Sequence, residues 1–310
     1  MLQQVAEPKT LAEAIKYFAD PDRCLEFLIP LRWPSGIACP RCACADHSFL
    51  KTRRIWKCKG CKRQFSIKVG TVMEDSPIKL STWLCAIWMI ANCRNGISSY
   101  EIHRGLGVCQ KTAWFLLHRV RYAMKAGTFT KLSGTVECDE SYIGGRAEFM
   151  HKSKREKAIK GRGTAGKAIV MGILERGGKV RARTIPNTKM ETLHREVEAN
   201  VEPGSHVMTD PQPGYRALNA TFDHDTVNHS AGEYVRGAIH TNGIENFWSL
   251  LKRAIKGTYI SVNAEHLDAY ADEQAFRYNV RELKDGVRFT TATSGITGKR
   301  LTYKRLTGKA

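Results

Sequence analysis

Three acidic residues have types and spacing that could bind divalent metal ions. Asp139 and Asp210 each close an apolar run typical of a β-strand, and Glu245 follows within a stretch of helical periodicity. Two carboxylates at strand ends and one on a helix can converge on a pair of ions that clamps the attacking and leaving oxygens of a phosphodiester. Carboxylate oxygens favour Mg²⁺ or Mn²⁺. The alternative, three solvated acids at the ends of elements, is the common case for one such residue alone.

The helix predicted over residues 242–256 has two distinct sides. Its apolar stripe consists of Ile244, Phe247, Trp248, Leu251 and Ile255. Glu245 and Lys252 lie together on a polar line, two turns apart. Lys252 could therefore hold a DNA phosphate beside the bond that is cleaved, whereas on an ordinary solvated face it would have no such role.

Two CxxC pairs near the N-terminus have the spacing of a zinc site. Cys39 and Cys42 form the first pair and Cys58 and Cys61 the second, with fifteen residues (43–57) between them. The segment between the pairs alternates enough to form a β-ribbon, and Trp56 and Phe65 could pack over a core too small to be stable without metal. We therefore expect one structural Zn²⁺.

Composition indicates a nucleic-acid partner. The 310 residues include 49 Lys and Arg against 30 Asp and Glu, a net charge of +19, which favours a polyanion such as DNA. Residues 1–8 lack the pattern of a signal peptide, and the longest apolar run, 83–91, is too short to span a bilayer. We expect no membrane contact and a cytoplasmic protein associated with DNA, in which the ten cysteines would be metal ligands or buried thiols.

Residues 80–125 have the pattern of a helix-turn-helix. Ser98 and Glu101 form a capping box that opens a second helix, and a glycine-rich turn at 105–108 separates it from a third helix that begins near Gln110. Such a unit places its last helix in the major groove. The candidate DNA contacts of this helix are Lys111, His118, Arg119 and Arg121. A plain helical linker is the alternative.

The second half alternates strands and helices in the order of a ribonuclease-H-like α/β domain. Strands are predicted at 136–141, 168–174, 180–185, 206–210 and 222–227. Three helices are predicted: one that begins after Thr188, one at 242–256 and one at 264–280. Thr188 would cap the first of them, with Glu191 as its partner in a capping box. In this arrangement the first and fourth strands lie side by side, so Asp139 and Asp210 become neighbours and the helix brings Glu245 to them.

A segment rich in Lys, Arg and Gly, residues 144–167, separates the first two of these strands. It lacks apolar periodicity, so it is either a surface loop or a loop that becomes ordered on phosphates. Beside a site that cuts DNA we prefer the second interpretation. The expected DNA contacts of the catalytic domain are then Lys154, Arg155, Lys252 and Arg253.

Several motifs resemble a known family. Residues 139–145 (DESYIGG), 227–235 (VNHSAGEYV) and 240–253 (HTNGIENFWSLLKR), with the pattern from Tyr270 to Arg281, are similar to the DDE-type transposases of bacterial insertion sequences that carry an N-terminal zinc ribbon. The resemblance covers about residues 20–282. It implies that Asp139, Asp210 and Glu245 are the metal-binding triad and Lys252 an accessory lysine. Because some members use Asn as the third ligand, Asn242 or Asn246 remains an alternative to Glu245.

These observations predict an α/β protein in which a ribonuclease-H-like catalytic domain follows a small zinc ribbon and a helix-turn-helix domain. The expected segments are a helical segment at 1–35, the zinc ribbon at 36–70, the helix-turn-helix at 71–130, the catalytic domain at 131–285 and a basic tail at 286–310. We expect a DNA transposase that uses two Mg²⁺ or Mn²⁺ ions and acts on terminal inverted repeats and target DNA as a homodimer or larger oligomer. The rivals are a zinc-ribbon transcription regulator without catalysis and a nuclease of the same fold that does not join strands.

Overall fold

The computed structural model describes residues 8–125, 130–145, 151–158, 164–227 and 239–308. The chain forms two compact units, Met1–Lys125 with Glu282–Ala310, and Ala126–Arg281. We call these the N-terminal unit and the catalytic unit, the second after the predicted catalytic domain (131–285), most of which it contains. None of the described helices is both long and apolar enough to cross a membrane.

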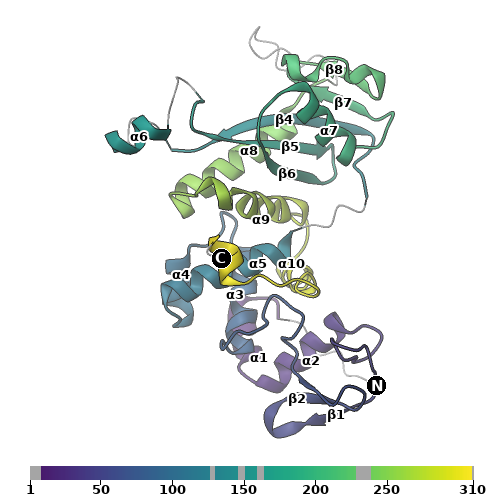
Figure 1. Ribbon diagram of the computed structural model, residues 1–310, viewed down its shortest axis with the longest axis vertical. Coiled ribbons are helices and arrows are strands. Elements are labelled where there is room, and N and C mark those ends of the chain that lie inside the picture. The colour runs from purple at the N-terminus through teal and green to yellow at the C-terminus, as the bar shows by residue number, and fades with distance from the viewer. Residues whose placement is uncertain (1–7, 126–129, 146–150, 159–163, 228–238, 309–310) are drawn as a thin grey trace. The chain divides into compact units, whose positions relative to one another are not determined.

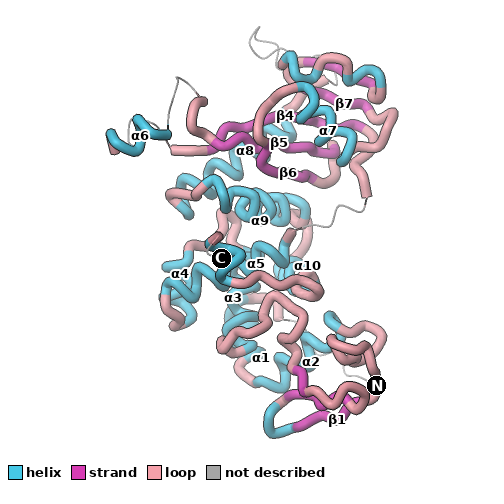
Figure 2. Tube along the Cα trace, viewed as in Figure 1, coloured by secondary structure: helices cyan, strands magenta, loops and turns pink. Residues whose placement is uncertain are grey.

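The N-terminal unit begins with two helices and a β-ribbon. The predicted helical run is divided at Pro21 into α1 (Leu11–Phe18) and α2 (Pro21–Arg32), because a proline is best tolerated in the first turn of a helix. The ribbon pairs β1 (His47–Leu50), β2 (Ile55–Cys58) and β3 (Gln64–Phe65), drawn in magenta in Figure 2. Trp56 and Phe65 are buried and stack at 5.7 Å, which confirms the predicted small core.

Three helices follow where the helix-turn-helix was predicted. They are α3 (Leu80–Asn92), α4 (Ser99–Leu106) and α5 (Gln110–Met124). The predicted capping box is present, with Ser98 and Glu101 each accepting the other's backbone N–H. Gly107 ends α4 with a φ of 66°, a conformation that glycine adopts without strain.

The segment predicted as a basic tail is instead part of the N-terminal unit. Helix α10 (Asp285–Ser294) packs on α3, and α11 (Tyr303–Thr307) follows it. Phe289 is buried from α10 and its ring lies 5.0 Å from that of Trp88. The tail prediction is therefore wrong, because these apolar residues are buried against helices nearly 200 positions earlier in the chain.

The catalytic unit has the predicted α/β order. Its strands are β4 (Thr135–Ile143), β5 (Ala168–Glu175), β6 (Val180–Ile185), β7 (His206–Thr209) and β8 (Asp223–Thr226). They form one sheet in the order β6-β5-β4-β7-β8, with β4, β5 and β6 antiparallel and with β7 and β8 parallel to β4 (Figure 1). The parallel pairing puts the segments that carry Asp139 and Asp210 side by side, as predicted. The prediction that Asp139 ends its strand is wrong, because β4 continues to Ile143 in register with β5.

Helices cover both faces of this sheet. Helix α7 (Met190–Asn200) packs on one face through Leu193 and Val197, and α8 (Asn242–Ala254) and α9 (Leu267–Asn279) pack on the other. A π-helical turn, η6 (Ile255–Tyr259), continues α8. Short 3₁₀ turns lie at Pro213–Tyr215, Leu218–Ala220 and Ala264–His266.

Two local predictions in this unit are wrong. Helix α7 begins at Met190 without a capping box, because Asn187 Oδ1 accepts bonds from the backbone of Lys189 and the hydroxyl of Thr192. The basic segment 144–167 is not wholly a loop in its described part, since α6 (Lys152–Ala158) lies within it.

Candidate active site

Adjacent parallel strands place the two candidate aspartates. Glu137 of β4 pairs with Met208 of β7, so Asp139 and Asp210 each lie two residues further on in neighbouring strands. Asp210 directly follows β7, and its Oδ1 accepts a bond from the backbone N–H of Gln212 at 3.2 Å, which turns the carboxylate toward the chain that follows the strand.

A tryptophan from α8 orients Asp139. The indole Nε1 of Trp248 donates to Asp139 Oδ2 at 2.8 Å. Trp248 can approach because Gly172 is the partner of Asp139 on β5, and a Cβ at Gly172 would lie only 2.7 Å from the indole ring. The sequence placed Trp248 in the apolar stripe and did not reveal this polar role. One oxygen of Asp139 is therefore held by the protein.

The charge of Asp139 is unfavourable in the metal-free protein. Burial, with smaller contributions from the negative charges of Asp210 and Glu245, raises the pKa of Asp139 to about 6 in spite of the hydrogen bond from Trp248. This coupling shows that the three predicted acids lie in one electrostatic neighbourhood. Among the described residues, however, the three acids are not gathered closely enough to form a ready ligand group for one ion.

A buried ion pair fixes the start of α8. Glu137, with 1% of its surface exposed, accepts the backbone N–H of Ile244 at 2.9 Å and bonds from the guanidinium of Arg176 at 3.1 Å. Arg176 also donates to the carbonyl of His240 at 2.9 Å, just before the helix. A Cβ at Gly243 would lie 2.8 Å from Glu137 Oε2, so the close approach requires glycine there. Glu245 stands in the turn that this contact positions.

The face of α8 that carries Glu245 is exposed and becomes basic toward its C-terminal end. Glu245 and both alternative ligands, Asn242 and Asn246, are exposed in the first turns. Lys252 and Arg253 are exposed in the last turn. The helix thus presents a candidate metal ligand and candidate phosphate contacts on the same side, as the spacing predicted.

A fourth acid, which the sequence interpretation missed, lies beside the site. Burial, with smaller contributions from the charges of Asp139 and Asp210, raises the pKa of Glu140 to about 8 against the effect of a hydrogen bond from the Tyr215 hydroxyl. Glu140 follows Asp139 on β4 and therefore points to the opposite face of the sheet. The sequence contained one signal, an acid directly after Asp139 within a predicted strand.

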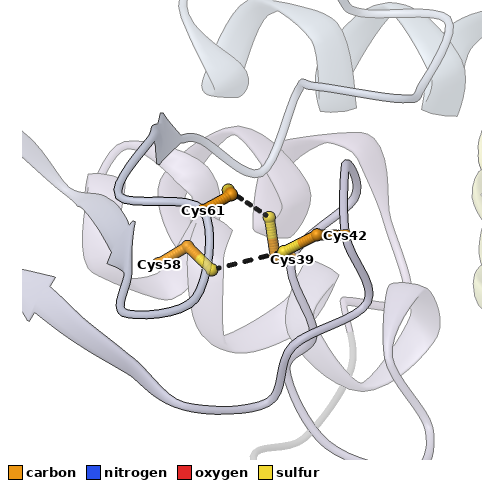
Figure 3. A group of neighbouring side chains, drawn as sticks. All are labelled: Cys39, Cys42, Cys58 and Cys61. Carbon is orange, nitrogen blue, oxygen red and sulfur yellow. Dashed lines mark hydrogen bonds between the residues drawn. The ribbon is translucent and has the colours of Figure 1, made fainter.

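The four predicted cysteines come together as a metal site in the N-terminal unit. The ligand atoms of Cys39, Cys42, Cys58 and Cys61 all lie within 4.8 Å of one another (Figure 3). The Sγ atoms of Cys39 and Cys61 are 3.7 Å apart and those of Cys42 and Cys58 are 3.6 Å apart. Tetrahedral Zn²⁺ with Zn–S bonds of about 2.3 Å separates its sulfurs by about 3.8 Å. The thiols therefore fit a structural zinc.

Most of the predicted DNA contacts on α5 are buried. His118, Arg119 and Arg121 are at most 5% exposed. Arg119 donates to the backbone carbonyls of Leu301 and Glu74, within the same unit. The prediction that these three contact DNA is therefore wrong for this conformation, because their side chains belong to the helix packing. Lys111, in the first turn of α5, is exposed as predicted.

The other predicted contacts lie on or near the basic segment of the catalytic unit. Arg155 is exposed on α6, whereas the side chain of Lys154 lies outside the described part of the chain. Residues 228–235 of the motif that follows β8 are also outside it.

Comparison with known proteins gives two matches along the chain. Residues 131–279 match a family model described as an ISXO2-like transposase domain, and residues 19–64 match one described as a transposase zinc-ribbon domain. A protein of Halobacterium salinarum, named as an uncharacterized protein in transposable element ISH50, is 30% identical over 251 residues. That alignment covers 77% of this chain and 84% of the relative.

Proposed function

Because the chain belongs to the ISXO2-like transposases, we propose that its catalytic unit cuts and joins DNA with Asp139, Asp210 and Glu245 as ligands of two Mg²⁺ or Mn²⁺ ions. The observation that carries this proposal is the arrangement of the elements: β4 and β7 are parallel neighbours that bring Asp139 and Asp210 close together, and Trp248 of the helix that bears Glu245 bonds to Asp139. The charges of Asp210 and Glu245 also contribute to the raised pKa of Asp139, and carboxylates are a suitable donor set for hard divalent cations. When bound, such ions would activate the attacking oxygen and stabilise the leaving oxygen of a phosphodiester.

The chemistry needs two similar steps. In the first, the oxygen of water bonds to phosphorus and the bond to the 3′ oxygen breaks, which releases a 3′-hydroxyl. In the second, the oxygen of that hydroxyl bonds to the phosphorus of a target phosphodiester, and the bond from this phosphorus to the target strand's own 3′ oxygen breaks. The proton of the attacking hydroxyl passes through solvent to the departing 3′ oxygen, and the strands become joined. The protein positions the reacting groups in both steps and forms no covalent bond to DNA.

Different side chains would position different reacting groups. Trp248 holds one oxygen of Asp139 and would orient its carboxylate. Glu137 and Arg176 fix the first turn of α8 and with it Glu245. Lys252, further along the exposed side of α8, would contact a phosphate, because an ammonium binds phosphate and not a cation.

The remaining groups serve DNA binding. The cysteine cluster would hold one structural Zn²⁺ and stabilise the ribbon. Lys111, Arg155 and Arg253 are exposed cations that would contact duplex DNA, both the terminal repeats of the element and the target. Two element ends require two active sites, so we expect a homodimer or larger oligomer on DNA. Such a partner would place the protein in the cytoplasm at the nucleoid.

Alanine variants of the acids test the function. Asp139→Ala, Asp210→Ala and Glu245→Ala should each abolish Mg²⁺-dependent cleavage of a duplex carrying an element end while leaving its binding nearly unchanged. Ser249→Ala, on the same exposed side of α8, is the matched control and should cleave normally. Lys252→Ala should slow cleavage without preventing metal binding.

Each contrary outcome identifies a different error. Normal cleavage by Glu245→Ala with loss in Asn242→Ala or Asn246→Ala would move the third ligand. Cleavage without joining would indicate a nuclease. Normal behaviour of all three acid variants would refute the assigned active site.

A further inference from the structure

The chain leaves α8 through a strained turn with an isoleucine at its tip. After the π-helical turn Ile255–Tyr259, Ile260 has φ 63° and ψ −53°. The backbone N–H of Ser261 donates to the carbonyl of Tyr259 at 2.6 Å, which closes a three-residue γ-turn of the rare, strained kind around Ile260. A positive φ is an outlier for a β-branched residue.

The apolar side chain at this tip points to solvent. Ile260 is 75% exposed, more than any other large apolar residue in the described part of the chain. A single exposed apolar residue on a protein surface is ordinary. An exposed apolar residue that also occupies a strained conformation is not, because glycine or asparagine would fit the turn at lower energy.

Buried contacts beneath the turn hold it in place. The Tyr259 hydroxyl donates to Glu273 Oε1, and the Tyr259 ring lies 4.6 Å from that of Tyr270 on α9. Glu273 is fully buried and is also bonded to Arg277. Strained backbone persists where the surrounding structure over-determines it, and such positions cluster at functional sites. The tip is therefore a rigid projection from a well-packed base.

The surface that leads to this tip is cationic. Lys252, Arg253 and Lys256 are exposed along the last turns of α8 and the π-helical turn, and no described carboxylate forms an ion pair with them. This row begins on the helix face that carries Glu245. A cationic row that ends in an apolar projection matches duplex DNA, since phosphates bind cations and base steps accept inserted Ile, Leu, Phe or Met side chains.

We propose that Ile260 is a wedge that inserts between base pairs of the DNA whose phosphates lie along α8, and that it unstacks one step close to the cleavage site. The inference rests on the proposed function, since it takes the phosphodiester near Glu245 as the point of cleavage. Fifteen residues separate Glu245 from Ile260, or roughly 20 Å at about 1.5 Å per residue. At about 3.4 Å per base, the unstacked step lies about six base pairs from the scissile bond.

Fluorescence of 2-aminopurine tests the wedge directly, because its emission rises when the base loses its stacking. The probe is a set of duplexes that carry the DNA flanking the gene, each with one 2-aminopurine at a successive position. With zinc-loaded full-length protein, we expect a rise at one or two positions about six base pairs from the cleaved bond. Ile260→Ala should lose this rise while binding the duplex, and Ile260→Leu should retain it.

Two controls separate the wedge from a general surface effect. Met190→Ala removes another exposed apolar side chain of the catalytic unit, at the start of α7 on the opposite face of the sheet, and should leave the fluorescence profile unchanged. Without the wedge, Ile260→Ala should cleave a fully paired duplex more slowly. A duplex with a mismatch at the unstacked step should restore the cleavage rate of this variant, because the distortion is then already present.

The outcomes distinguish failure of the wedge from failure of the active site. An unchanged fluorescence profile in Ile260→Ala, with cleavage still dependent on Asp139, would overturn the wedge and leave the proposed function intact. Loss of protein–protein association in Ile260→Ala with an unchanged profile would assign the tip to a second copy of the chain and also overturn it. Absence of cleavage by the unmodified protein on every flanking duplex would instead refute the proposed function.

Discussion

Replacement of Asp139 by asparagine should stabilise the metal-free protein at neutral pH. The pKa of Asp139 is about 6 in the folded protein against its usual 3.8, a difference of about 2 pH units. The folded state thus holds the proton more tightly than the unfolded chain does, so stability is lost as the pH rises from about 4 to about 6. Each unit corresponds to about 1.4 kcal/mol, which gives a cost of about 3 kcal/mol at pH 7. Asparagine removes the charge but can still accept the bond from Trp248.

Thermal unfolding at pH 7.5 and pH 4 measures this effect. The buffer should contain no magnesium and no chelator, because a chelator would also remove zinc. A gain of about 3 kcal/mol in a unit of this size raises the Tm by about 6–12 °C, and the gain should disappear at pH 4. Asp223→Asn, an exposed aspartate of the same sheet, is the control and should change little.

Added Mg²⁺ should then reverse the order of stability. The unmodified protein should gain stability with the magnesium concentration, because the ion binds the folded state alone, whereas Asp139→Asn should gain little. If Asp139→Asn is no more stable than the unmodified protein at pH 7.5 without magnesium, the ionised carboxylate of Asp139 does not destabilise the fold. That result would refute the electrostatic reasoning on which the metal site depends.

Two further substitutions test the zinc and the packing at the active site. Cys58→Ser should lose the bound zinc and unfold the ribbon, as measured by elemental analysis and circular dichroism, while Cys109→Ser, an exposed cysteine outside the cluster, should retain zinc. Gly172→Ala should lower the free energy of unfolding in urea by about 1–3 kcal/mol, because the new methyl group would overlap the Trp248 ring. The same substitution should reduce cleavage by displacing Asp139. Full cleavage activity would argue against the role assigned to the indole.

The strands and the cysteine cluster were predictable because their signals are local. Apolar alternation marked β4, β5 and β6 to within two residues, and the paired CxxC motifs located the four cysteines that gather. The spatial neighbourhood of Asp139 and Asp210 followed from strand order, since β4 and β7 are parallel neighbours. These inferences require only the chain near each residue and the topology of a common fold.

The errors in the N-terminal unit share one long-range cause. We predicted that α5 contacts DNA and that residues 286–310 form a basic tail. In the structure, the described part of this segment packs on α5 instead. Leu301 supplies its carbonyl to Arg119, and Lys299 donates to the carbonyl of Ala123. A single sequence shows that Arg119 is charged and on a helix; it does not show that a segment 180 residues later covers it.

The protein compensates the charges of Glu137 and Asp139 differently, and this contrast separates a structural acid from the proposed metal ligand. They lie two residues apart on β4 and point to the same face, toward α8. The protein compensates Glu137 with the guanidinium of Arg176 and with the N-terminus of a helix, both of which favour negative charge. The described hydrogen bonds to Asp139 come from neutral donors, the indole of Trp248 and the backbone N–H of Glu140, and no described basic side chain forms an ion pair with it. The negative charges of Asp210 and Glu245 disfavour the ionised form of Asp139 further. A divalent cation would supply the missing positive charge, so under the proposed function the imbalance that destabilises the metal-free fold would favour binding of the ions.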